Sequence, residues 1–326
     1  MKIIDTRIFP TSNSGINRAM NWVARRTDDT PEILWVIEGA ASYGALLTAA
    51  VTTCGFRVAE APQLGRHLAA GKGKTDTLDA QRIAVDTLPV DEARLRTPRT
   101  HDGIRAAVRV LVTARDAMAE ERTRDINALT VLLRTHDLRI DARRRLTNTQ
   151  IYQVGCWRSR NEPLVQATAR AEAMRLARRV TALDAELTGN LVELTELLQF
   201  SQGAALLAQP GFGPVATAIC LMAWSHHGRI RLEAAFAALA GVNPIPASSG
   251  NTVRHRLNRG GDRRLNQALH MVALNRMTYD AETKAYDAKR QAEGRTTKEI
   301  LRSVKRYLAR RVYRTLSAAD PVLIAA

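Results

Sequence analysis

The sequence predicts an α/β region at the N-terminus, followed by a mainly helical remainder. Two observations support this prediction. Between residues 32 and 61 the chain alternates as strand, helix and strand, the order of a right-handed βαβ unit. Beyond Pro98 it has long stretches with few glycine or proline residues to interrupt a helix. Because the chain has 326 residues, it can form two domains with separate cores.

The N-terminal elements follow from short apolar runs bounded by turn residues. The run EILWVIEG at 32–39 is short and continuous, which is typical of a strand buried in an α/β sheet. The helix after it ends before Gly55, because glycine is a common helix stop. The expected elements are strands at 1–9, 32–39 and 56–61, and helices at 16–26, 41–54 and 74–85.

The middle of the chain predicts two long helices, at 101–135 and 163–200. In the second helix, apolar residues recur at intervals of three and four positions, which is close to a coiled-coil seam. The seam consists of Leu176, Val180, Leu183, Leu187, Leu191, Leu194 and Leu198. Either a partner helix from a second subunit covers this seam, or the chain covers it in an intramolecular hairpin.

The composition indicates a polyanionic partner. The chain has 48 Lys and Arg against 32 Asp and Glu, which makes a formal net charge of +16. Such a surplus is typical of proteins that bind nucleic acid. Cys54, Cys156 and Cys220 lack the spacing of a zinc site, and no apolar run is long enough to span a membrane. We therefore expect a cytoplasmic, nucleoid-associated protein that is not inserted in a membrane.

The stretch from Gly241 to Leu265 combines a Ser-Ser-Gly turn with arginines and a glycine pair. Hydroxyls, free backbone amides and fixed positive charge suit a loop that faces phosphate. A solvated, arginine-rich turn is the alternative. The arginines expected to bind nucleic acid are Arg254, Arg256, Arg259, Arg263 and Arg264.

A second expected contact with phosphate is the Pro-Gly-x-Gly turn that contains Gly211 and Gly213. The turn separates two predicted helices, as in helix-hairpin-helix DNA-binding units. Its backbone amides are available to a phosphate.

Three carboxylates of the N-terminal region form a candidate metal site. Glu38 ends an apolar strand, at the sheet edge where open α/β folds bind ligands. Asp76 and Asp79 are three positions apart at the start of a helix, so they share a face. Mg²⁺ prefers such carboxylates together with phosphate oxygens. The alternative is that the aspartates only stabilise the helix N-terminus and that Glu38 is a surface acid.

Together these motifs resemble the insertion-sequence-110 transposases, DEDD recombinases with a RuvC-like (ribonuclease-H-like) domain. The N-terminal matches are Glu38-Gly39, Ser42-Tyr43-Gly44 and GKTDTLDA at 73–80. The distal matches are PGFG at 210–213, FAALAG at 236–241, Pro244, Ser249-Gly250, Arg259-Gly260-Gly261 and Arg264-Leu265. They follow the family's order over nearly the whole chain.

The resemblance implies a division into three parts. These are a RuvC-like domain at 1–100, a helical coiled-coil region at 101–202, and a mainly helical transposase domain with a helix-hairpin-helix-like motif at 203–326. It also implies DNA as substrate, a structured bridge RNA as guide, Mg²⁺ as cofactor, and assembly as a homodimer or homotetramer.

The resemblance further assigns the catalytic residues. Glu38, Asp76 and Asp79 match the second, third and fourth acids of DEDD. Ser249, the serine directly before glycine, matches the nucleophile that becomes joined to a DNA phosphate, and whether Ser248 can replace it stays open.

One departure concerns the first DEDD acid, which lies in the family on an opening strand within a Gly-x-Asp pattern. This sequence starts after that place, and Asp5 has the neighbours of a later strand. We therefore expect either a misassigned start or a truncated copy. The alternatives to an active recombinase are an inactive DNA- or RNA-binding remnant and a metal-dependent junction nuclease without a serine step.

Overall fold

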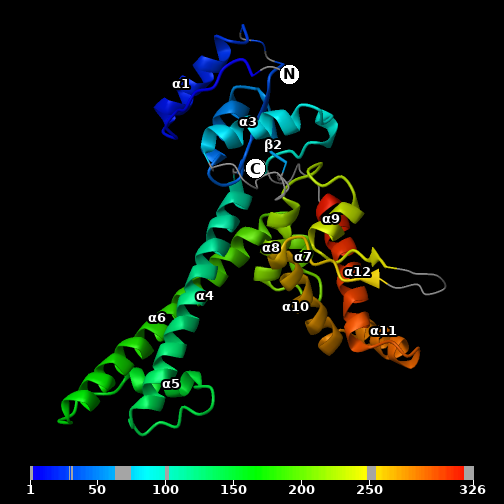
Figure 1. The fold of residues 1–326 in the computed structure, drawn as a ribbon. Helices are drawn as coiled ribbons and strands as arrows, with labels where there is room; N and C mark the ends of the chain where they lie inside the picture. The colour runs from blue at the N-terminus through cyan, green and yellow to red at the C-terminus, as the bar shows by residue number, and fades with distance from the viewer. Residues whose placement is uncertain are drawn as a thin grey trace. The chain divides into compact units, whose positions relative to one another are not determined.

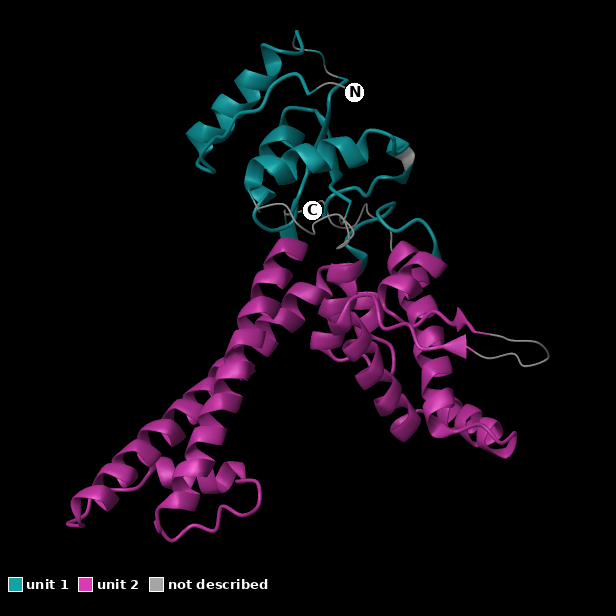
Figure 2. Ribbon diagram, viewed as in Figure 1, with its two compact units in different colours: residues 1–103, 224–232 teal, residues 104–223, 233–326 magenta. Residues whose placement is uncertain are grey.

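A computed structural model describes residues 3–28, 30, 32–62, 75–99, 103–247 and 255–318. The chain forms two compact units (Figure 2). Unit 1 consists of Met1–Gly103 and Trp224–Leu232, and unit 2 consists of Ile104–Ala223 and Glu233–Ala326. The described part of the chain is mostly helical, with two small sheets (Figure 1). Each of its helices is too short or too polar to cross a bilayer.

Unit 1 is built on two parallel strands, β1 (Leu34–Ile37) and β2 (Arg57–Glu60). The first and last residues of β1 lie opposite the first and last residues of β2. The helices of this unit are α1 (Asn13–Ala24), α2 (Ala45–Thr53), α3 (Asp76–Thr87) and the short 3₁₀ helix η2 (Glu92–Arg94). Since α2 connects the strands and contacts β2, the βαβ order expected from residues 32–61 is confirmed.

The strand expected at 1–9 is wrong for the residues that the structure describes. Residues 3–9 form no strand, and Ile4 and Ile8 stay exposed. Instead, the ring of Phe9 packs edge-on against Trp22 of α1, with the ring centroids 5.7 Å apart. An extended segment without a neighbouring strand gains no ladder of hydrogen bonds, so contact with α1 decides its path. The described part of unit 1 has a two-stranded sheet, smaller than the sheet that a RuvC-like domain implies.

Unit 2 begins with a helical hairpin of α4 (Gly103–Thr135), α5 (Asn148–Gly155) and α6 (Leu164–Gln199). The long helices α4 and α6 lie side by side (Figure 1), and polar groups connect them. Asn190 donates from its side-chain amide to the carbonyl of Leu111 at 3.0 Å, and Arg122 pairs with Asp184. These contacts hold the two helices in one register.

The apolar seam of α6 is covered within the same chain. Its residues Leu176 and Val180 belong to a buried cluster that also contains Leu129 and Leu133 of α4 and Ile151 of α5. Further along the seam, the buried residues are Leu183, Leu194 and Leu198. Of the two arrangements expected for this seam, the structure has the intramolecular hairpin. A second subunit is not needed to bury it.

The remainder of unit 2 packs around α12 (Thr297–Ala318), which contacts α7, α9, α10 and α11. Val304, Leu308, Val312 and Leu316 of α12 recur at spacings of four and are buried, which makes one apolar face. The other elements are α7 (Ala204–Leu207), α8 (Pro214–Trp224), α9 (Glu233–Leu239), β3 (Ile245–Pro246), β4 (His255–Arg256), α10 (Arg263–Tyr279) and α11 (Ala281–Ala292). The helical C-terminal region expected from the sequence is confirmed.

Candidate nucleic-acid interface

The arginine-rich stretch forms a short antiparallel ribbon of β3 and β4. Ile245 lies opposite Arg256, and Pro246 lies opposite His255. Ser248, Ser249 and Arg254, which the sequence singles out, lie between the two strands and outside the described residues. The structure therefore describes the two ends of the segment that contains the predicted nucleophile.

Close backbone contacts hold the base of this ribbon. Gly261 has a φ of +91°, and a Cβ there would lie 2.5 Å from the carbonyl oxygen of Leu239 at the end of α9. Gly241 has a φ of +63°, and its Cβ would lie 2.6 Å from the carbonyl oxygen of Gly260. Only glycine fits such approaches without strain. The Gly-Gly pair thus fastens the ribbon to the end of α9.

Side-chain amides complete the base. Asn258 donates to the Oδ1 of Asn243 at 2.6 Å, across the two arms that lead into the ribbon. Asn266 of α10 donates to the carbonyl of Ala240 at 2.7 Å, and its own Oδ1 accepts from the Nζ of Lys305 at 2.6 Å. This chain of hydrogen bonds ties the ribbon to α10 and α12.

The described arginines of the stretch have two different environments. Arg256, Arg259 and Arg263 are exposed, so their guanidinium groups are available to a polyanion. Arg264 instead pairs with Asp116 of α4 and donates to the carbonyl of Val112 at 3.2 Å. Its charge is compensated within the chain, which gives it a packing role between α10 and α4. The predicted contact between Arg264 and nucleic acid stays a prediction.

The glycines of the Pro-Gly-x-Gly turn, between α7 and α8, also differ from each other. Gly211 has a φ of +83°, and a Cβ there would lie 2.8 Å from the Cγ of Arg276. A glycine is therefore required at position 211, where the turn packs against α10. A Cβ on Gly213 would meet open space, so this exposed position has room for an approaching phosphate. The predicted binding role of both glycines stays a prediction.

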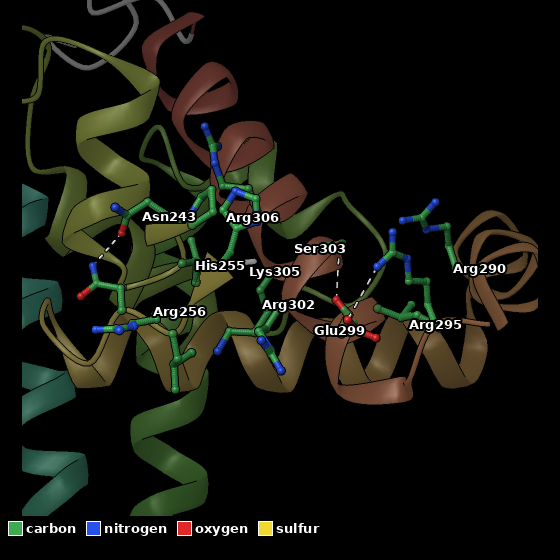
Figure 3. Close-up of a pocket in the computed structure, with 16 residues that line it drawn as sticks. Asn243, His255, Arg256, Arg290, Arg295, Glu299, Arg302, Ser303, Lys305 and Arg306 are labelled. Atoms are coloured by element: carbon green, nitrogen blue, oxygen red, sulfur yellow. Dashed lines mark hydrogen bonds and ion pairs between the residues drawn. The ribbon is translucent and has the colours of Figure 1, made fainter. Parts of the chain in front are cut away.

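A basic cavity of about 610 Å³ lies between β4, α12 and the end of α11 (Figure 3). Asn243 and Lys305, which belong to the base of the ribbon, line part of it. The charged and titratable residues on its wall are His255, Arg256, Arg290, Arg295, Glu299, Arg302, Lys305 and Arg306. The basic residues of α12 and of the segment before it could not be recognised as a site from the sequence, because their spacing is that of the polar face of any amphipathic helix.

The three acids of unit 1 occupy neighbouring elements without forming a metal site. Glu38 is exposed just beyond the end of β1, and Asp76 is exposed in the first turn of α3, a helix that contacts β1. Asp79 is half-buried and pairs with Arg82 at 3.4 Å. In the described part of the chain, no three His, Cys, Asp or Glu side chains gather closely enough to hold a metal ion. As they lie, these acids do not fit a three-ligand Mg²⁺ site.

The helix N-terminus explains part of this arrangement. Thr75 is the N-cap of α3 and accepts from the backbone amide of Leu78 at 3.3 Å. Asp76 and Asp79 therefore lie in the first turn, where the helix dipole stabilises negative charge. The capping alternative explains their positions in this chain without a metal.

Two family models match the chain in the order in which its motifs occur. Residues 1–137 match the DEDD transposase model of IS110. Residues 203–288 match the model described as Transposase IS116/IS110/IS902 family. The chain belongs to the IS110 family of transposases.

A curated relative supports the same assignment for this IS110-family transposase. It is the insertion element IS110 uncharacterized 43.6 kDa protein of Streptomyces coelicolor, which is 26% identical over 358 residues. The alignment covers 94% of this chain and 87% of the relative. As a transposase, the protein acts on DNA, and the basic ribbon, Gly213 and the basic cavity all lie within the part of the chain that matches the second model or next to it.

Proposed function

We propose that this transposase cuts and rejoins DNA with Ser249 as its nucleophile, that it depends on Mg²⁺, and that a structured RNA guides it. The observation that carries the proposal is the basic ribbon. The segment that contains Ser249 begins and ends at β3 and β4, next to exposed Arg256 and Arg259. Positive charge around a serine is the environment in which a phosphate can be bound and attacked.

The proposed chemistry consists of two transesterifications. The Ser249 Oγ attacks a DNA phosphorus, a new P–O bond forms, and the bond from phosphorus to one deoxyribose oxygen breaks. The serine proton goes to a base or to solvent, and the departing deoxyribose oxygen gains a proton. The hydroxyl of a second strand then attacks the same phosphorus and releases the serine.

The residues of this chain contribute mainly through charge. A serine hydroxyl is a weak nucleophile until a neighbouring group favours its deprotonation. Guanidinium groups such as that of Arg256 stabilise the extra negative charge on the phosphoryl oxygens during attack. Magnesium dependence is proposed from the DEDD family and from the carboxylates Glu38, Asp76 and Asp79, which do not gather into a site in this chain. We propose that acids and serine meet between the subunits of a homodimer or homotetramer.

A covalent adduct tests the nucleophile. The full chain is incubated with labelled DNA that carries the ends of the element and with RNA transcribed from it, and the products are separated on a denaturing protein gel. We expect a labelled protein band that Ser249→Ala abolishes and that the matched Ser248→Ala variant retains. An undiminished adduct in Ser249→Ala would refute the assignment.

The position of the acids favours one alternative, a DNA-binding protein without catalytic activity. This alternative predicts binding to the same DNA with neither adduct nor cleavage. A metal-dependent nuclease, the other alternative, predicts cleavage that EDTA abolishes and no adduct in either serine variant. The same gel, run with and without EDTA, therefore distinguishes all three functions.

A further inference from the structure

The basic cavity between β4 and α12 has more positive charge than its own acids compensate. Three of its basic residues are in ion pairs. Arg290 pairs with Glu293, Arg295 pairs with Glu299 at 3.7 Å, and Arg306 pairs with Glu233 at 3.3 Å. Among the described residues, neither Arg302 nor Lys305 lies within ion-pair distance of a carboxylate, and Glu299 acts on Arg302 only through longer-range attraction. The cavity therefore contains positive charge that the described residues do not neutralise.

The acid in the cavity wall is already occupied. Glu299 accepts hydrogen bonds from the backbone amide and the hydroxyl of Thr296, both at 2.9 Å, at the start of α12. The bond from the backbone amide of Thr296 is the main reason why the pKa of Glu299 lies below its ordinary value. Glu299 thus stabilises the helix N-terminus and leaves most of the cavity wall positive.

Lys305 is the residue that most needs an external anion. Its side chain is half-buried, and burial lowers its pKa from the ordinary value. Its Nζ donates one hydrogen bond, to the neutral Oδ1 of Asn266 at 2.6 Å, so two of its three N–H donors have no protein acceptor among the described residues. A half-buried ammonium without a counter-ion is costly unless a ligand supplies negative charge.

The spread of the cations indicates an extended anion. They come from β4 (Arg256), the end of α11 (Arg290), the turn after it (Arg295) and α12 (Arg302), and Figure 3 shows them on different sides of the cavity. Because the cavity of about 610 Å³ is much larger than one phosphate group, it has room for consecutive phosphates of a strand beside these cations. The exposed side chain of Leu257 also lines the cavity and suits contact with sugars and bases.

We propose that the basic cavity binds consecutive phosphates of the DNA strand on which the transposase acts. The choice of DNA rests on the proposed function, because the cavity wall continues into β4 and hence into the segment that contains Ser249. Arg302 and Lys305 are binding residues in this proposal, and the base of the ribbon fixes Lys305 through Asn266.

The test measures binding and needs no chemistry. The full-length Ser249→Ala chain is titrated into fluorescent single-stranded DNA, and into RNA of the same sequence, at a series of sodium chloride concentrations. The variants are Arg302→Gln, which changes an exposed residue, and the double variant Arg302→Gln with Lys305→Gln. The controls remove exposed cations of the same helix outside the cavity: Arg311→Gln, and Arg311→Gln with Lys298→Gln.

We expect Arg302→Gln to raise the Kd for DNA about tenfold, which corresponds to about 1.4 kcal/mol for the loss of one contact with a charged phosphate. The slope of log Kd against log salt should fall by about 0.7 for the single variant and by about 1.4 for the double variant. The reason is that binding releases fewer counterions from the DNA when fewer phosphates are contacted. The controls should keep the slope of the parent chain.

Two results would overturn the proposal. One is equal salt slopes for Arg302→Gln and Arg311→Gln with DNA. The other is a loss of affinity for RNA alone, which would assign the cavity to the guide. Because these measurements use a chain without Ser249, they are independent of the adduct assay. A negative result for phosphate binding by the cavity would leave the proposed serine step untouched, and a negative result for the serine step would leave the cavity proposal untouched.

Discussion

Gly261 offers the sharpest test of how the ribbon is held. We predict that Gly261→Ala loosens the contact between α9 and α10. Its φ of +91° is unfavourable for alanine, which costs about 1–2 kcal/mol in the left-handed region. The added Cβ would also lie 2.5 Å from the Leu239 oxygen and 2.9 Å from the Gly241 nitrogen.

Both of these neighbours are backbone atoms, so no side chain can rotate away. Overpacking of this kind costs about 1–3 kcal/mol. It also disturbs the hydrogen bond from the amide of Asp262 to the carbonyl of Leu239, which is 2.6 Å long. Together the backbone strain and the overpacking come to about 2–5 kcal/mol. This is a large part of a typical folding free energy of about 5–15 kcal/mol.

Hydrogen exchange measured by mass spectrometry reports this loss locally, so the two units need not unfold together. At about 1.4 kcal/mol per factor of ten, protection in the segments 236–247 and 255–269 should fall about a hundredfold. Gly294→Ala is the matched control, because its φ is +78° and a Cβ there meets no atom within 4 Å. Its effect should be limited to backbone strain. An equal loss of protection in both variants would show that the close approach at Gly261 contributes nothing to the stability of this contact.

Two further predictions concern charged groups of unit 2. A hydrogen bond from the side chain of Thr283 is the main reason why the pKa of Asp280 falls from 3.8 to about 2. Because the folded pKa lies below the unfolded one, this carboxylate stabilises the fold above about pH 4 and loses its effect as the pH falls to about 2. The melting temperature of Asp280→Asn should therefore fall less between pH 4 and pH 2 than that of the unaltered chain. An identical fall in the two proteins would contradict the assignment. Arg264→Gln should lower the melting temperature, since it breaks the pair with Asp116, whereas Arg263→Gln, at an exposed neighbouring position, should weaken DNA binding and leave the melting temperature unchanged. The opposite pattern in these two variants would show that Arg264 binds DNA and that Arg263 stabilises the fold.

Periodic patterns allowed the helical architecture to be predicted from the sequence. The runs at 101–135 and 163–200 match α4 and α6 closely, because long stretches with few glycine or proline residues leave few competing structures. The helix expected at 74–85 likewise corresponds to α3. The N-terminal strand was wrong because strand formation depends on a neighbour, which no local pattern reveals.

The candidate site was predictable only where one stretch of chain carries the signal. The Ser-Ser-Gly segment and its arginines are adjacent in the sequence, and so is the Gly-Gly pair that holds them. The ion pair of Arg264 with Asp116 joins positions far apart in the chain, and the cavity forms only because α12 lies against β4. Charges such as Arg302 become a binding site through packing, which spacing along one helix cannot show.

Unit 1 is built from two separate parts of the chain, and this has a consequence for how it folds during synthesis. Arg229, whose side chain is 7% exposed, lies 3.4 Å from Glu60 and belongs to the short segment by which the chain returns to this unit. Domains generally fold as their residues leave the ribosome, the N-terminal part first. Unit 1 obtains this buried partner only after the whole α4–α6 hairpin has been translated. A nascent chain that stops at residue 103 therefore lacks a piece of its own first unit.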